Sequence, residues 1–387
     1  MMIKKNIVHF IYMTVILLIM IVPVLMTNNE PEKRSFIDNA FLPEFPDMSE
    51  GGYVQGKLEN YLNKRIGFRE QAVYLYETGV SRLFNKLEHN LYAYGKNGYI
   101  MGNMEEYIKD YQHLNLNQDA EFVDSFALWL SNANKYLKEN DIEFLYFLAP
   151  DKKTIYHEYV SDTINVLGDV SRTDMLLGRI EELEVPYIYP KNEFLKAKEG
   201  QQIYNVKYDA LHWNDLGNFL GNKIIDHYMQ TLPYEITPLG EQQYELSYAH
   251  VDKLMASCFY IYEDTPYYSL KEEEGICDIS ADDEFKKEID GDFEHYINEN
   301  LTDAPFILIL HDSYFVDSAK YYKGRYREVV SIHNSNYWKL QEVIEHYQPD
   351  IVLFENVERV IAGDFFSVDK LKEWQASPLA DREKTGF

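Results

Sequence analysis

The spacing of apolar residues predicts helices that alternate with buried strands. One helix is predicted by apolar residues that recur at helical spacing: Phe122, Phe126, Trp129, Leu130, Ala133 and Leu137. A dense apolar run at residues 142–149 comes next, ends at a proline and predicts a buried strand. The same patterns predict strands at 185–189, 306–310 and 351–354, and helices at 215–229 and 340–347. Strands buried on both faces and separated by helices indicate a mostly parallel α/β sheet.

The N-terminus carries a nearly continuous apolar run, residues 7–26, interrupted by His9 and Thr14. A helix of about 20 residues crosses the hydrocarbon layer of a bilayer. Lys4 and Lys5 precede the run, so the short N-terminus is expected to stay in the cytoplasm. The run ends without a small-x-small site, which favours an uncleaved anchor over a signal peptide.

These patterns predict three parts of the chain. Residues 1–27 form the anchor, and residues 28–52, which have little periodicity, form a juxtamembrane spacer. Residues 53–387 form the external domain, beginning with one or two helices over 56–86. The pattern breaks down over about 233–300, an acidic stretch expected to be an insertion or peripheral lobe.

The formal net charge of -27 argues against nucleic acid as a partner, because phosphate binding needs a basic surface. The two cysteines, Cys258 and Cys277, both lie on the expected external side. The sequence leaves open whether they pair, since it does not show whether their Cβ atoms meet.

A candidate catalytic pair lies in the segment 209–214, DALHWN, just before the helix expected from Asp215. An Asp three positions before a His can accept the imidazole Nδ1–H in a turn and leave Nε2 free as a base. Asp209 and His212 therefore supply two members of a triad, or a structural hydrogen-bonded pair.

A candidate nucleophile, Ser313, follows the strand expected at 306–310. A serine on the turn that leaves a buried strand can meet a base, and nearby backbone N–H groups can hold an oxyanion. The alternative is a serine that caps the next helix.

Together these motifs resemble an SGNH-like family that includes the alginate O-acetyltransferases AlgX and AlgJ and the bacterial DHHW proteins. The resemblance rests on ordered motifs along most of the external domain: Asn63 to Arg69, Tyr94 to Tyr99, Ala149 to Lys152 with Ile155 and Tyr156, Asp209 to Asn214, Asp312 with Ser313, Gln348 to Val352, and Val357 to Arg359.

The resemblance implies an SGNH, flavodoxin-like parallel sheet flanked by helices, with the motif order permuted so that Asp and His precede Ser. It implies Ser313 as nucleophile, His212 as general base and Asp209 as the residue that orients the base. Two positions depart from the family pattern. Ala210 and Leu211 both separate Asp209 from His212, where relatives usually have one residue, and His311 stands where relatives usually have a small residue.

Other candidate site residues have equally ordinary alternatives. The oxyanion hole is expected to include the Ser313 N–H, with Asn334 or Asn336 as side-chain donors or simply turn residues. Trp213 is either a sugar-stacking platform or a ring packed under the sheet edge. A metal site built from His212 and His311 is disfavoured because these histidines lack helical ligand spacing.

The resemblance implies an extracytoplasmic O-acetyltransferase that acts on a cell-surface or secreted polysaccharide through an acetyl-serine, without cofactor or metal. Its acetyl donor would be delivered by a multipass membrane acyltransferase. A carbohydrate acetylesterase and a catalytically inactive glycan-binding or scaffold protein are the alternatives.

Overall fold

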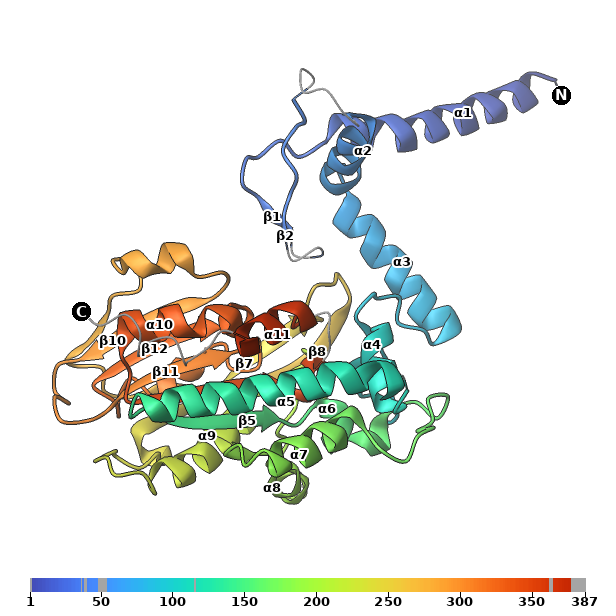
Figure 1. The fold of residues 1–387 in the computed structure, drawn as a ribbon. Helices are drawn as coiled ribbons and strands as arrows, with labels where there is room; N and C mark the ends of the chain where they lie inside the picture. The colour runs from blue at the N-terminus through green and yellow to red at the C-terminus, as the bar shows by residue number, and fades with distance from the viewer. Residues whose placement is uncertain are drawn as a thin grey trace. The chain divides into compact units, whose positions relative to one another are not determined.

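The computed structural model describes residues 2–35, 37, 40–47, 54–114, 116–361 and 365–376 (Figure 1). The chain forms two compact units. Unit 1 comprises Met1–His89 and Val251–Tyr262, and unit 2 comprises Asn90–His250 and Glu263–Phe387. The expected end of the spacer at residue 52 and the expected start of the external domain at Tyr53 lie outside the described residues.

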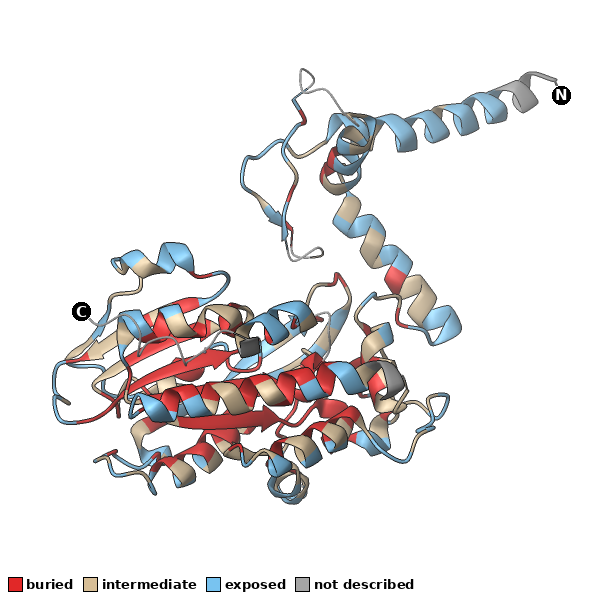
Figure 2. Cartoon of the chain, viewed as in Figure 1, coloured by how far each residue is buried: buried red, intermediate tan, exposed pale blue. Residues whose placement is uncertain are grey.

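Unit 1 begins with a long apolar helix, α1 (Met2–Leu25). Its stretch Ile7–Leu25 has a mean hydropathy of 2.6 and lies exposed along its length (Figure 2). Among the described residues, this is the one helix that is long and apolar enough to cross a membrane. An N-terminal signal sequence can have the same length and composition. The unit continues through β1 (Arg34–Ser35), β2 (Ala40–Phe41), α2 (Val54–Arg65) and α3 (Arg69–Phe84).

The segment that follows α1 is fastened to the end of α2. The buried Arg65 guanidinium donates hydrogen bonds to the carbonyls of Asn28, Glu30, Leu42 and Pro43. The Asn28 N–H in turn donates to the Arg65 carbonyl (2.8 Å). The Gly67 N–H donates to the Pro23 carbonyl at 2.9 Å, and a Cβ at Gly67 would lie 2.5 Å from the Met26 Cβ, so the approach requires glycine.

Unit 2 is built on a seven-stranded sheet in the order β6-β5-β13-β11-β12-β10-β9. Its strands are β5 (Glu143–Ala149), β6 (Tyr187–Ile188), β9 (Ile276–Asp278), β10 (Phe293–Asn298), β11 (Phe306–His311), β12 (Glu328–His333) and β13 (Ile351–Val357). The strands from β6 to β12 pair in parallel, and β10 and β9 add antiparallel. The predicted mostly parallel α/β sheet is confirmed. Part of the acidic stretch expected to be an insertion supplies β9 and β10 at its edge.

Helices cover both faces of the sheet, so its central strands are buried on both sides (Figures 1 and 2). On one face, Phe126 of α5 (Leu116–Glu139) packs on Tyr146 and Phe354, with ring centroids 6.1 and 6.3 Å away. On the other face is α9 (Asp215–Met229), where a Cβ at Gly221 would lie 3.6 Å from the Phe147 ring. Successive strand residues point to opposite faces, which is why Tyr146 and Phe147 meet different helices.

The remaining elements of the described residues are helices and two small sheets. The helices are α4 (Glu105–Tyr111), α6 (Lys152–Ile155), α7 (Arg172–Glu182), α8 (Lys191–Ala197), α10 (Leu340–Tyr347) and α11 (Val368–Ala376). The short 3-10 helices are η1 (His157–Tyr159), η2 (Glu241–Gln243), η3 (Glu284–Glu288), η4 (Ser318–Tyr321), η5 (Asn334–Lys339) and η6 (Glu358–Val360). Two further sheets pair β3 (Tyr92–Tyr94) with β4 (Ile100–Gly102), and β7 (Tyr244–Lys253) with β8 (Tyr260–Leu270). Cys258 is a buried free thiol and Cys277 an exposed one.

Candidate active site

Ser313 lies on the turn that leaves β11, at the carboxyl edge of the parallel strands. Its neighbours Asp312 and Tyr314 are buried, while Ser313 itself is exposed. The Asp312 carboxylate holds the turn by accepting hydrogen bonds from the N–H groups of Tyr314 and Val357, each at 2.8 Å. The bond to Val357 ties the turn to the end of β13, so the sheet fixes the position of the serine.

His212 lies on the loop that enters α9. Asn214 ends this loop as the helix N-cap, accepting hydrogen bonds from the N–H groups of Leu216 and Gly217, both at 3.1 Å. A Cβ at Gly217 would lie 2.4 Å from the Ile203 carbonyl oxygen, so glycine lets the helix approach this closely. The same Cβ would lie 2.8 Å from the Trp213 Cβ, so the loop packs closely against the first turn of α9.

The structure brings Asp209, His212 and Ser313 into a hydrogen-bonded chain. The His212 Nδ1 lies 2.8 Å from both Asp209 carboxylate oxygens, and its Nε2 lies 2.9 Å from the Ser313 Oγ. A carboxylate only accepts, so Nδ1 carries the ring proton, Nε2 is the acceptor and the serine hydroxyl donates to it. This arrangement has the geometry of a nucleophile, its base and the group that orients the base.

Asp209 is held in an unusual conformation with an altered pKa. Its φ of 44° lies in the left-handed region, which is uncommon for residues other than glycine. Burial raises the pKa of its carboxyl. The facing His212 ring, the Leu211 N–H and the Arg359 charge outweigh that effect and bring the pKa below its ordinary value. Asp209 is therefore ionised at neutral pH and can stabilise an imidazolium.

The backbone N–H of Ser313 makes no hydrogen bond within the part of the chain that the structure describes. It can donate to an oxyanion formed at the serine. The two candidate side-chain donors have other partners. Asn334 donates to the Glu355 carbonyl at 3.0 Å, and the Asn336 amide donates to the carbonyls of Asp290 and His333. Both are buried, so their amide groups act as braces between loops.

Trp213 is 6% exposed, and its ring packs among neighbouring side chains. Its Nε1–H donates to the Tyr314 carbonyl at 2.9 Å. This bond joins the loop that carries His212 (the base loop, residues 205–214) to the turn that carries Ser313 (the nucleophile turn, residues 312–314). The indole stacks on Phe194 with ring centroids 5.7 Å apart. A Cβ at Gly221 would lie 2.9 Å from the indole, so the ring fills the space left on α9.

Among the described residues, no group of three or more His, Cys, Asp or Glu side chains is placed to hold a metal ion. Both ring nitrogens of His212 are engaged by Asp209 and Ser313. The buried His311 bonds through Nδ1 to the Asp312 carbonyl at 2.7 Å, and burial lowers its pKa. His311 therefore braces the turn from beneath.

Two charged side chains fasten the base loop: Glu263, which no sequence pattern singled out, and Lys152, which the motif from Ala149 to Lys152 contains. The Glu263 carboxylate on β8 accepts three successive N–H groups, those of Val206, Lys207 and Tyr208, at 2.5, 2.8 and 2.6 Å. The fully buried Lys152 Nζ donates to the Asn205 carbonyl at 2.6 Å, and burial lowers the pKa of this lysine to about 8. These contacts join residues far apart in sequence, so no local pattern announces them.

No protein-family model matches the chain, and no curated protein matches it by sequence. Solved structures do match. PatB1 from Bacillus cereus is 15% identical, with a TM-score of 0.52 over 70% of this chain and 97% of PatB1. The same protein with a sulfonyl adduct is 17% identical at a TM-score of 0.52, over 71% of this chain and 96% of that chain.

The O-acetyltransferase domain of Pseudomonas putida AlgJ is 10% identical, with a TM-score of 0.51 over 74% of this chain and 99% of that domain. The chain has the fold of these proteins. The fold class expected from the AlgX and AlgJ resemblance is therefore confirmed, and the chain spans nearly the full length of both neighbours.

Proposed function

We propose that this protein is a serine-dependent O-acetyltransferase that acts on an extracytoplasmic polysaccharide through an acetyl-serine at Ser313. The chain of hydrogen bonds from Asp209 through His212 to Ser313 carries the proposal. The match to the AlgJ O-acetyltransferase domain supports acetyl as the group transferred.

The proposed reaction is a double displacement. His212 Nε2 takes the Ser313 hydroxyl proton as Oγ attacks the acetyl carbonyl carbon, and the Ser313 N–H stabilises the oxyanion. The tetrahedral intermediate collapses, its bond to the donor oxygen breaks, and the imidazolium returns the proton to the leaving alcohol. A glycan hydroxyl then attacks the acetyl-serine with His212 again as base, which releases the acetylated glycan and restores the serine.

Water as acceptor in the second half would yield acetate, and the protein would then be a carbohydrate acetylesterase. A catalytically inactive glycan-binding or scaffold protein is the alternative outside catalysis. In the proposed topology α1 is a single-pass anchor, the remainder is outside, and a multipass membrane acyltransferase delivers the acetyl donor. The apolar, exposed α1 supports the anchor.

The test begins with the purified full chain and an aryl acetate as acetyl donor. We expect acetate release, an acetyl adduct on the Ser313 peptide after rapid quenching, and faster turnover when acceptor oligosaccharides are present. In Ser313→Ala these activities should fall by about a millionfold. Acetate release that acceptor oligosaccharides do not accelerate would favour the esterase.

Labelling with phenylmethylsulfonyl fluoride tests for an activated serine without an acetyl donor, since the Oγ displaces fluoride from sulfur. Wild-type protein should gain one adduct on Ser313, and Ser313→Ala none. Well-folded wild-type protein that neither forms the adduct nor releases acetate would favour the inactive binding protein.

A further inference from the structure

Arg359 contacts both segments that carry the proposed triad. It lies on η6, just after β13, and is 9% exposed. Its Nη1 donates to the Leu211 carbonyl at 2.7 Å, next to His212 in sequence. The guanidinium carbon also lies 4.9 Å from the centre of the Tyr314 ring, next to Ser313. One planar cation therefore touches the base loop and the nucleophile turn.

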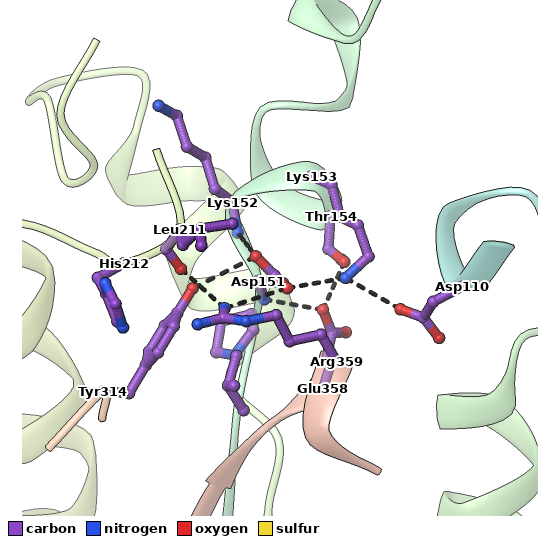
Figure 3. A network of polar contacts seen from close by, with 12 residues as sticks. Asp110, Asp151, Lys152, Lys153, Thr154, Leu211, His212, Tyr314, Glu358 and Arg359 are labelled. Atoms are coloured by element: carbon purple, nitrogen blue, oxygen red, sulfur yellow. Dashed lines mark hydrogen bonds and ion pairs between the residues drawn. The ribbon is translucent and has the colours of Figure 1, made fainter. Parts of the chain in front are cut away.

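The guanidinium is itself oriented by Asp151, at the start of α6. The Asp151 carboxylate, which is fully buried, lies 3.3 Å from Arg359 Nη1 and 2.8 Å from Lys153 Nζ, and it accepts the Lys152 N–H at 2.7 Å. Figure 3 shows the network, with Asp151 between Arg359 and Lys153 and with Leu211, His212 and Tyr314 on the side of Arg359. A buried pair of this kind holds its geometry because breaking it would leave a buried charge without a partner.

We infer that Arg359 is a positioning residue of the triad, which sets the separation of His212 from Ser313 by holding Leu211 and Tyr314 on one guanidinium. The inference concerns the site of the proposed function. Arg359 does not contact the reacting atoms. It acts through the loop carbonyl, the aromatic ring and its positive charge, which helps to keep the Asp209 carboxyl ionised.

Several charged or titratable groups lie around the Asp209 carboxylate. The groups around Asp209 are His212, Arg359, Lys152 and the hydroxyls of Tyr92 and Tyr208. Arg359 is one of the causes that lower the pKa of Asp209, after His212 and the Leu211 N–H. Removing the charge at 359 should raise the pKa at which Asp209 ionises, so the acid limb of activity should move to higher pH.

Arg325 is a matched control in the same unit. It is 1% exposed, donates to the Asp226 carboxylate at 2.5 Å and to the Tyr321 carbonyl at 2.8 Å, and lies 5.5 Å from the centre of the Tyr326 ring. It therefore makes the same three kinds of contact as Arg359. None of these contacts involves the base loop or the nucleophile turn.

The kinetic experiment compares Arg359→Met, Arg359→Lys and Arg325→Met in acetate release from an aryl acetate, per folded molecule. Arg359→Met should lower kcat by about 100-fold with little change in KM, because displacing a reacting group by about 1 Å costs that much. Its acid limb of kcat/KM should move up in pH. Arg359→Lys should lose rate but keep the limb, since the charge stays and the fork is lost. Arg325→Met should keep both at wild-type values.

An NMR experiment tests the geometry without turnover. In wild-type protein and Arg325→Met the His212 Nδ1–H bonded to Asp209 should give a protected downfield proton signal, and in Arg359→Met that signal should be lost. Retention of this signal in Arg359→Met, together with the kcat and acid limb of Arg325→Met, would overturn the inference. If wild-type protein releases no acetate and takes no sulfonyl label, but the signal is present in wild type and Arg325→Met and lost in Arg359→Met, the inference stands and the proposed function fails.

Discussion

The backbone N–H of Asp312, which precedes Ser313, donates a hydrogen bond of 3.2 Å to the fully buried carboxyl of Glu355 on β13. Burial, and then the facing Asp312 carboxylate, raise the pKa of Glu355 well above its ordinary value. A carboxyl with a raised pKa therefore lies against the nucleophile turn, next to the Asp312 carboxylate that holds the turn.

This pair leads to a prediction for Glu355→Gln. A carboxyl whose pKa is raised by folding destabilises the protein once the pH exceeds its unfolded pKa of about 4.3, by about 1.4 kcal/mol for each unit up to the folded pKa. The neutral glutamine removes this loss. The free energy of unfolding by urea should fall less between pH 4.5 and 7 in Glu355→Gln than in wild type. The exposed Glu342→Gln should behave as wild type, and equal pH dependence in both variants would contradict the prediction.

Replacing Asp209 by Asn should lower kcat by about 10²–10⁴-fold while the protein stays folded. The amide cannot stabilise the imidazolium that forms when His212 takes the serine proton. Acetate release and the rate of sulfonyl labelling both measure the effect. Asp162→Asn is the control, because that side chain is 85% exposed and pairs with Lys96 on the surface. A variant with the wild-type labelling rate would show that Asp209 does not activate the serine.

Trp213→Ala should destabilise the fold and leave acceptor binding per folded molecule unchanged. Truncating a buried aromatic side chain costs about 3–5 kcal/mol. The indole also donates the hydrogen bond that joins the base loop to Tyr314, so kcat should fall with stability. Urea unfolding measures the loss of stability, and the KM for an acceptor oligosaccharide measures acceptor binding. A raised KM at wild-type stability would instead indicate sugar stacking.

The contacts of His295 on β10, near the antiparallel edge of the sheet, predict a second pH dependence of the free energy of unfolding. Its ring bonds to Asp283 at 2.7 Å and to Glu328 at 2.9 Å. Burial lowers its pKa, but the two carboxylates outweigh burial and raise the pKa above its ordinary value. A raised histidine pKa stabilises the fold fully below the unfolded pKa of about 6.5, and the contribution is lost as the pH rises through the folded pKa.

The free energy of unfolding of His295→Gln should therefore differ most from wild type below about pH 6.5, and the difference should shrink at alkaline pH. Unfolding by urea at pH 5.5, 7.5 and 9 measures it. His250→Gln serves as the control, because His250 and its partner Asp264 are 47% and 57% exposed. A destabilisation of His295→Gln that is constant over this range would refute the assignment.

The parts of the fold with strong local patterns were predictable. The expected helices at 215–229 and 340–347 have the bounds of α9 and α10, and the run at 306–310 is β11. A strand inside a parallel sheet is apolar on both faces, so it stands out from its surroundings. By contrast β12 (Glu328–His333) and β10 (Phe293–Asn298) carry charged and polar residues among apolar ones, because they lie toward the sheet edge.

Some residues of the candidate site were predictable from the sequence, and others were not. Asp209 and His212 lie three positions apart, so local geometry could place one on the other. Ser313 could be placed only through the family resemblance and its position after a buried strand. The partners of Asn334 and Trp213, and the role of Arg359, depend on contacts between distant segments. No sequence period carries that information.

In the proposed topology, the contacts of Arg65 limit how far the segment after α1 can extend from the membrane. A free chain of 25 residues has an end-to-end distance of about 25–30 Å and would act as a slack tether. Here the chain returns to its own start, because Arg65 binds the carbonyls of Asn28 and Glu30 and Gly67 binds Pro23. The segment is a closed loop at its base and adds no reach. If unit 2 carries out the proposed acetyl transfer, its effective concentration near a membrane-held donor would be set by the chain after Gly67, and lengthening the loop should not alter it.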